Sequence, residues 1–162
     1  MRHGSAEGTG SDGTDHTRTL TAVGEAEASI QGHFLGLSGI VPQFVATSSA
    51  QRAKSTGERV LDALGKGPEL TVAESLYNAP GVVLLAYVQS LPHHVDTALL
   101  VAHMPGVAEL LAMVTSEFAE VTMAYTPATL SCVTFPNAAS WEDALLSSGR
   151  LEWLLPPMLL PV

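Results

Sequence analysis

Positive charge is scarce in this sequence. Lys and Arg together number 7 in 162 residues, against 16 Asp and Glu, for a net charge of −9. Nucleic acids and anionic membranes attract proteins mainly through clustered Lys and Arg side chains. The composition therefore argues against both as partners. Scarcity also makes each basic side chain informative, notably Arg2, Arg18 and Arg52.

Cysteine and long apolar runs are scarce as well. Cys132 is the single cysteine, which excludes a disulfide framework and a thiolate metal cluster. The longest apolar run, residues 81–88, is too short to span a bilayer, and the stretch 98–114 is interrupted by a histidine, a proline and a glutamate. No apolar segment follows Arg2 as it would in a secretory signal. These absences predict a cytoplasmic protein.

What the sequence does have is the composition of a compact globular protein, with 46% hydrophobic and 14% charged residues. Residues 1–162 are expected to form one domain, because no linker interrupts them. Residues 4–15 are rich in Gly, Ser, Thr and Asp and are expected to form a loop. A helix should follow Thr21, a good N-cap residue, with an apolar face made by Val23, Ala26, Ile30, Phe34 and Leu37.

Further along the chain, helix patterns alternate with short strand patterns. Ser48 or Ser49 is expected to cap the second helix, and Gly65 to end it. Later helices are expected at 80–89 and 107–115, and strands at 43–47, 70–72, 97–102, 129–135 and 150–155. This alternation predicts an α/β domain with a largely parallel sheet flanked by helices.

The carboxyl ends of parallel strands are where ligands bind in such sheets. Arg52 and His103 each follow an expected strand, so both should reach the same edge of the sheet. The Arg2-His3-Gly4 sequence adds a second cation, a nucleophilic imidazole and a glycine that lets the backbone turn. Two arginines and two histidines at one edge predict a phosphate site.

These residues belong to five short stretches that occur in a fixed order. The stretches are Arg2-His3-Gly4, Arg18-Thr19-Leu20-Thr21 with Gly24, Ser48-Ser49-Ala50-Gln51-Arg52-Ala53, Glu74-Ser75-Leu76-Tyr77-Asn78-Ala79 and His103-Met104-Pro105-Gly106. In this order they resemble the histidine phosphatase superfamily, and within it the SixA-type phosphohistidine phosphatases, from residue 2 to about residue 135. The resemblance implies a phosphoglycerate-mutase-like fold.

Two departures from the resemblance concern the start of the chain and Thr19. Relatives have an apolar strand immediately before the Arg-His-Gly sequence, whereas this sequence begins with it. The first strand is therefore expected to be truncated, unless another segment holds His3 in place. Relatives often have proline where Thr19 stands, which should only loosen the approach to the following helix.

The resemblance also implies the roles of individual residues. His3 would be the nucleophile, Arg2 would hold the phosphoryl group, and Arg52 and His103 would complete the clamp. Glu74 is expected either to act as a general acid for the leaving group or to be a surface carboxylate, and both readings stay open. No metal and no cofactor are expected.

Other polar residues near these stretches have simpler expected roles. Arg18 could line the pocket, but pairing with Asp15 to fix the loop is the favoured reading. His16 is expected to be solvated. The adjacent His93 and His94 should lie in a surface turn without a metal, since no carboxylate or cysteine stands at ligand spacing.

The sequence thus predicts a metal-independent phosphatase acting on phosphohistidine in a protein, through a phosphohistidine intermediate on His3. One alternative is a phosphomonoesterase or mutase acting on small metabolites. Another is a non-catalytic phosphoprotein-binding module. The expected partner is a phosphorylated protein or a small phosphate ester, with no nucleic acid and no membrane.

Overall fold

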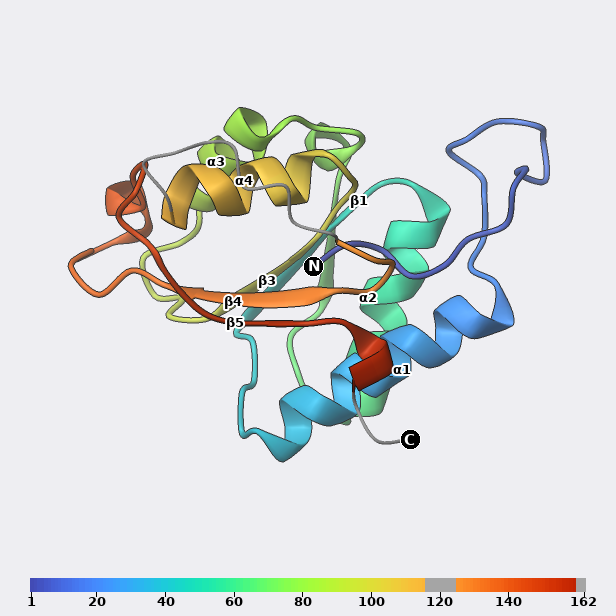
Figure 1. Cartoon of the computed structure of the whole chain (residues 1–162), viewed down its shortest axis with the longest axis horizontal. Coiled ribbons are helices and arrows are strands. Elements are labelled where there is room, and N and C mark those ends of the chain that lie inside the picture. Colours follow the sequence, from blue (N-terminus) through green and yellow to red (C-terminus); the bar gives the residue numbers. More distant parts are fainter. Residues whose placement is uncertain (116–124, 160–162) are drawn as a thin grey trace.

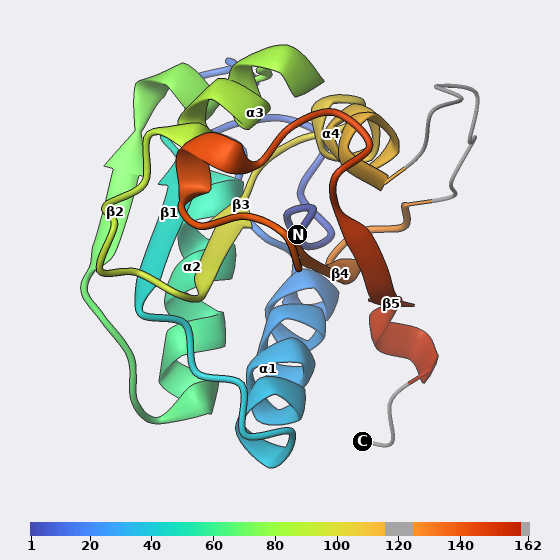
Figure 2. The same cartoon turned by 90° about the vertical axis from the view of Figure 1, so that its left-hand side faces the viewer.

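A computed structural model describes residues 1–115 and 125–159 of the chain. In it the strands form a middle layer, with α1 (Ala22–Leu37) and α2 (Gln51–Leu64) on one face and α3 (Gly81–Gln89) and α4 (Gly106–Thr115) on the other (Figures 1 and 2). The expected α/β architecture is confirmed. No helix among the described residues is long and apolar enough to cross a bilayer.

Three parallel strands form the first sheet in the order β2-β1-β3. The central strand is β1 (Phe44–Ser48), which pairs with β2 (Leu70–Ala73) on one side and β3 (Ala98–Val101) on the other. The apolar, partly β-branched stretches expected to be strands form them, within one or two residues. Because β1 and β3 are parallel, the residues that follow them emerge at the same edge of the sheet.

The last two strands form a separate antiparallel pair. β4 (Leu130–Thr134) pairs with β5 (Arg150–Leu155), with an irregularity between Cys132 and Val133. Short 3-10 turns lie at Glu74–Leu76, Trp141–Asp143 and Pro157–Leu159.

The start of the chain lies between β3 and the residues that lead into β4. The N–H of His3 donates to the carbonyl of Ala102 at 3.1 Å, and the N–H of Ala102 donates to Met1 at 3.1 Å. On the other side, the N–H of Arg2 donates to Thr129 at 3.1 Å, and the N–H of Ala128 donates to His3 at 3.0 Å. His3 is thus held on both sides by backbone hydrogen bonds, although only residues 1–3 of the described chain occupy this position.

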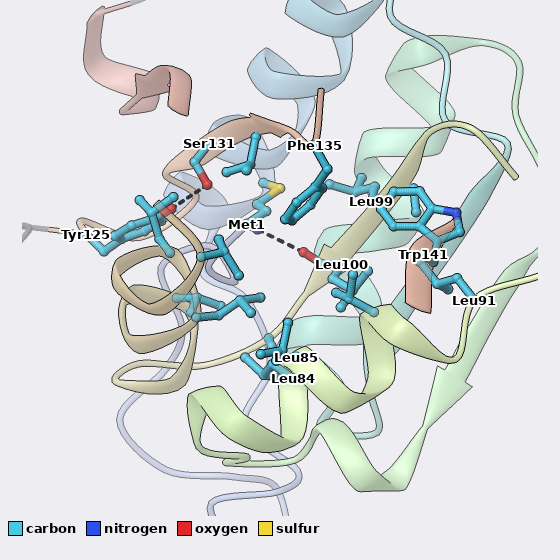
Figure 3. A pocket seen from close by; sticks show the side chains of 18 residues that line it. Met1, Leu84, Leu85, Leu91, Leu99, Leu100, Tyr125, Ser131, Phe135 and Trp141 are labelled. Atoms are coloured by element: carbon cyan, nitrogen blue, oxygen red, sulfur yellow. Dashed lines mark hydrogen bonds between the residues drawn. The ribbon is translucent and has the colours of Figure 1, made fainter. Parts of the chain in front are cut away.

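An apolar cavity of about 140 Å³ continues from that position (Figure 3). Its lining includes two residues of α3, two of β3 and two aromatic side chains: Leu84, Leu85, Leu99, Leu100, Phe135 and Trp141. The amino group of Met1 is buried at the edge of the cavity and donates to the carbonyl of Leu100 at 2.8 Å.

Helix α1 begins after Thr21 as expected, and the Thr21 side chain accepts a hydrogen bond from the N–H of Gly24. The expected apolar face is wrong in part: Val23 is 62% exposed and Leu37 is 90% exposed, whereas Phe34 packs against the core. The buried face carries mainly small residues, which allow α1 to approach its neighbours closely, and comprises Gly24, Ala28, Gln31, Gly32 and Leu35. The orientation of α1 is thus set by close contact between its backbone and its neighbours, and not only by the pattern of large apolar side chains.

Helix α2 begins at Gln51, and its N-cap is Ala50 without a side-chain cap, so neither Ser48 nor Ser49 caps it. Their hydroxyls instead contact histidines: His103 Nε2 lies 2.7 Å from the Oγ of Ser48, and His16 Nε2 lies 3.0 Å from that of Ser49. Gly65 ends α2 in the left-handed conformation, as expected, with φ of 72°.

Candidate active site

Backbone contacts fix the turn that carries His3. The N–H of Gly4 donates to the Oγ1 of Thr56 at 3.0 Å, and this hydroxyl donates to the carbonyl of Arg52 at 2.7 Å. A Cβ atom on Gly4 would lie 2.7 Å from the carbonyl oxygen of Gly24 in α1, and one on Gly24 would lie 2.0 Å from that of Ser5. Glycine is therefore required at both positions, because the two backbones touch.

Three of the predicted residues converge around one point at the carboxyl edge of the sheet. Arg52, 3% exposed in the first turn of α2, has its Nε 3.2 Å from Nε2 of His3. Its Nη2 lies 3.2 Å from Nδ1 of His103, which follows β3 and is 2% exposed. The centroids of the two imidazole rings are 5.1 Å apart. The structure thus brings His3, Arg52 and His103 together as the strand order predicted.

The hydrogen bonds of His3 define its tautomer. A guanidinium can only donate, so Nε2 of His3 accepts from Arg52. Nδ1 then carries the proton and donates to the carbonyl of Gly4 at 2.8 Å. Burial, assisted by the nearby arginines and opposed by the Gly4 bond, lowers the pKa of His3 to about 4. His3 is therefore neutral at pH 7, with the lone pair of Nε2 directed toward Arg52.

The same reasoning defines His103. Its Nδ1 accepts from Arg52, so Nε2 carries the proton and donates to the hydroxyl of Ser48 at 2.7 Å. Burial is the main cause that lowers the pKa of His103 to about 3, with His3 and Arg52 adding to the effect. Two neutral imidazoles thus present their unprotonated nitrogens to one guanidinium.

Arg2, which precedes His3, has a hydrogen-bond donor without an acceptor among the described residues. Its Nη1 donates to the carbonyl of Tyr125 at 2.6 Å, but its Nε is buried without a hydrogen-bond partner among the described residues. Burial lowers the pKa of Arg2, while the charge of Glu27 opposes this. A buried donor without a partner is costly, which is the condition expected of a group that binds an anionic ligand.

Comparison with known proteins shows which solved structures share the fold of this chain. No protein-family model and no curated protein matches the chain. The structure of the protein histidine phosphatase SixA complexed with tungstate matches it with a TM-score of 0.83 and 26% identity, covering 98% of this chain and 96% of that one. The SixA protein from Agrobacterium tumefaciens matches with a TM-score of 0.76 and 22% identity, covering 96% and 94%.

The chain belongs to the histidine phosphatase superfamily.

The family resemblance predicted from five short stretches is thereby confirmed, and the protein is a phosphatase of that superfamily. A more distant relative in the fold is a mycobacterial glucosyl-3-phosphoglycerate phosphatase, with a TM-score of 0.67 and 16% identity over 93% of this chain and 94% of that one. Among the described residues of the phosphatase, no group of three His, Cys, Asp or Glu side chains is placed to hold a metal ion.

Glu74 of the phosphatase is exposed at the start of a 3-10 turn, and no hydrogen bond or ion pair joins it to His3, Arg52 or His103 in the described parts of the chain. Its role as a general acid stays a prediction. Tyr77, three residues later, does reach the site: its ring lies edge-on to His103 with centroids 5.6 Å apart.

Asp15 is the site residue that the sequence reasoning missed. It was expected only to pair with Arg18, and that pair is confirmed at 2.8 Å. Its carboxylate also accepts from Arg52 Nη2 at 2.8 Å and from the Tyr77 hydroxyl at 2.9 Å. The neighbouring His16 bonds to Ser49 and packs edge-on against Tyr77, so the expectation that it is solvated is wrong. Nothing in the local pattern of residues 4–17 shows that this loop folds back on α2.

Proposed function

We propose that this phosphatase removes the phosphoryl group from phosphohistidine in a protein, without a metal, through a phosphohistidine intermediate on His3. The observation that carries the proposal is the neutral His3 imidazole, whose unprotonated Nε2 lies 3.2 Å from Nε of Arg52. A neutral imidazole is a nucleophile for phosphorus, whereas a protonated one is not.

In the first step, Nε2 of His3 attacks phosphorus in line with the leaving group. The N–P bond to His3 forms as the P–N bond of the substrate breaks. The other ring nitrogen of the substrate imidazole carries a proton, so the ring leaves with the bonding pair as a neutral imidazole. The Nδ1–H of His3 stays hydrogen-bonded to the carbonyl of Gly4 and stabilises positive charge that develops on the ring. In the second step, water attacks phosphorus, releases inorganic phosphate and returns the lone pair to Nε2.

The surrounding cations neutralise charge on the phosphoryl oxygens in both steps. The Nε–H of Arg52, which His3 accepts in the free enzyme, would turn to a phosphoryl oxygen as phosphorus approaches Nε2. The buried Nε–H of Arg2 would supply a second donor. Phosphoryl transfer depends mainly on such positioning and charge neutralisation, so these donors suffice without a metal.

Two features favour phosphohistidine over phosphate esters. A departing imidazole has an unperturbed conjugate-acid pKa of about 6.5 and needs little assistance, whereas an alkoxide needs a general acid. In addition, the match to SixA, a protein histidine phosphatase, covers nearly all of both chains. The alternatives are a phosphatase or mutase for small metabolites and a non-catalytic phosphoprotein-binding module.

The test is hydrolysis of an aryl phosphate and of a phosphohistidine-containing protein, each with a metal chelator present. We expect turnover of both, and none after His3→Ala. ³²P from the substrate should be trapped on His3 of the wild type when the reaction is quenched at alkaline pH, where the P–N bond of phosphohistidine is stable. Activity that survives in His3→Ala would exclude the covalent mechanism. Phosphate binding without any turnover by the wild type would instead support the binding module.

A further inference from the structure

The guanidinium of Arg52 uses two of its edges for two different purposes. The edge formed by Nε and Nη2 faces the unprotonated nitrogens of His3 and His103, each at 3.2 Å. The edge formed by Nη1 and Nη2 faces Asp15, whose carbonyl accepts from Nη1 at 2.6 Å and whose carboxylate accepts from Nη2 at 2.8 Å. One residue thus holds the outer edge of Arg52 through two different oxygens.

We infer that Asp15 is a positioning residue of the active site: it orients Arg52 so that the Nε–Nη2 edge is presented to the phosphoryl group. This inference rests on the proposed function, because it assigns Arg52 to the phosphoryl oxygens. The polar loop before α1 thus contributes one residue, Asp15, to the positioning of Arg52.

The Asp15 carboxylate is itself held in place. Its second oxygen accepts from Arg18 at 2.8 Å, and the oxygen facing Arg52 also accepts from the Tyr77 hydroxyl at 2.9 Å. The next residue, His16, accepts from the N–H of Gln51 at the start of α2 through its carbonyl, at 2.9 Å. These contacts fasten the loop to the same helix that carries Arg52, so Asp15 and Arg52 keep a fixed relation.

Two other roles for Asp15 fit the geometry less well. A general acid must carry a proton, but Arg18, Tyr77 and Arg52 hold the pKa of this carboxyl far below its usual range. A competitor for phosphate would occupy the Nε–Nη2 edge of Arg52 that faces His3, whereas Asp15 occupies the adjacent Nη1–Nη2 edge. The positioning role and the competitor role also predict opposite effects of Asp15 on phosphate affinity: a positioning residue raises the affinity, and a competitor lowers it.

The experiment is a double-mutant cycle on kcat/KM for an aryl phosphate. Arg52→Ala should lower kcat/KM by about 10²–10³-fold. Asp15→Ala should lower it by about 10–100-fold, the usual scale for a misplaced catalytic group, and Asp15→Asn by less, because its amide oxygen can still accept from Arg52. In the Arg52→Ala background, Asp15→Ala should change kcat/KM by no more than about twofold, because it acts through Arg52.

Asp12→Ala is the matched control for loop order. Asp12 lies in the same loop and accepts only from Thr14 and Thr17 among the described residues. We expect its kcat/KM within about twofold of the wild type. A loss equal to that of Asp15→Ala, or an undiminished Asp15 effect in the Arg52→Ala background, would overturn the inference.

Binding of inorganic phosphate, measured by calorimetry on the same four proteins of the cycle, separates this inference from the proposed function. If the wild type has no turnover but Asp15→Ala weakens phosphate binding only when Arg52 is present, the proposed function fails and the positioning role stands. Tighter phosphate binding by Asp15→Ala would show that Asp15 competes with the ligand, and would overturn the positioning role. Circular dichroism confirms that each variant is folded.

Discussion

At the scale of single residues, the site consists of two neutral histidines that share one guanidinium. Both imidazoles have a lone pair on the side of Arg52 and a proton on the side of a fixed acceptor, Gly4 for His3 and Ser48 for His103. The tautomers are therefore opposite, Nδ1–H for His3 and Nε2–H for His103. This assignment follows from the fact that arginine cannot accept a hydrogen bond.

A first prediction is that neither histidine titrates near neutrality. Burial lowers the pKa of His3 to about 4 and that of His103 to about 3. Ring ¹⁵N resonances should report the two opposite tautomers at pH 8 and remain unchanged down to about pH 5. His3→Ala and His103→Gln assign the signals. A transition of either ring at its ordinary pKa of about 6.5 would contradict the hydrogen-bond pattern.

A second prediction concerns the proton that His103 gains when an anion binds. Its Nδ1 faces the proposed phosphoryl site but carries no proton, so it can only donate to a bound oxyanion after taking one up. A nearby dianion raises the pKa of an imidazole. Sulfate binding at pH 6 should therefore take up about one proton, seen by calorimetry in two buffers of different ionisation enthalpy.

The variants for this second experiment are His103→Gln and His33→Gln. His103→Gln should bind sulfate without proton uptake, while His33→Gln, which changes an exposed histidine of α1, should behave as the wild type. Proton uptake that persists in His103→Gln would assign the proton to another group.

A third prediction separates the two readings of Glu74. Glu74 is exposed and makes no hydrogen bond or ion pair with His3, Arg52 or His103 among the described residues, which favours the surface reading over the general acid. Glu74→Gln should then leave cleavage of phosphohistidine unchanged, and the wild type should cleave phosphohistidine much faster than phosphoserine. Rates on both substrates at one pH decide this. A selective loss on phosphoserine would identify Glu74 as the acid, and a wild type that prefers phosphoserine would favour the metabolite phosphatases.

At the scale of secondary structure elements, the sequence was most informative about where strands and helices lie. Short apolar segments bounded by turn residues became strands, and Thr21 and Gly65 mark helix ends as their chemistry predicts. The inward face of α1 was predicted only in part, because small residues form much of its contact surface beside Phe34 and Leu35. The antiparallel pairing of β4 with β5 was missed as well, since pairing direction has no local signature.

The difference between local sequence patterns and tertiary contacts also explains which site residues the sequence predicted. His3, Arg52 and His103 follow recognisable stretches at strand ends or a helix start, so their meeting follows from strand order. Asp15 and Tyr77 reach the site through a loop and a turn whose paths depend on tertiary contacts. Such contacts leave no periodicity in the sequence.

A fourth prediction tests the close approach between α1 and the turn after His3. A Cβ on Gly24 would lie 2.0 Å from the carbonyl oxygen of Ser5, so Gly24→Ala must displace one backbone from the other. We expect it to destabilise the protein by about 1–3 kcal/mol or more and to lower kcat, because the turn carries His3.

Gly36→Ala is the control on the same helix. A Cβ there would meet only Leu64 Cδ1 at 3.6 Å, an ordinary contact. Alanine should then stabilise α1 by about 0.5–1 kcal/mol through its better helix propensity, with kcat unchanged. Denaturant unfolding and kcat measured on both variants check this. Equal destabilisation by the two substitutions would mean that α1 tolerates no alanine at all, and the contact at Gly24 would not be special.

At the scale of the whole molecule, residues 1–3 join β3 to the residues that lead into β4 through backbone hydrogen bonds, with the cavity beside them (Figure 3). A polypeptide that begins at Met1 places its amine there, and burial lowers the pKa of that amine from 8.0 to about 5. Between pH 5 and 8 the amine binds a proton in the unfolded chain but not in the folded one. Folding therefore releases a proton, and this contribution to stability falls as the pH is lowered through that window.

The last prediction follows from both features. An extension of five apolar residues before Met1 removes the buried amine and would prolong the segment that pairs with the end of β3, with apolar side chains for the cavity. Tm should rise by several degrees, at about 2–4 °C per kcal/mol for a chain of this size, and the part of its pH dependence due to the amine should disappear. Activity should rise less than stability, because His3 is already held on both sides. A Gly-Ser extension of equal length, the control, should remove the pH dependence without the full rise in Tm. If both extensions raise Tm equally, the gain comes from removing the amine alone, and the cavity between the sheets does not accept a strand.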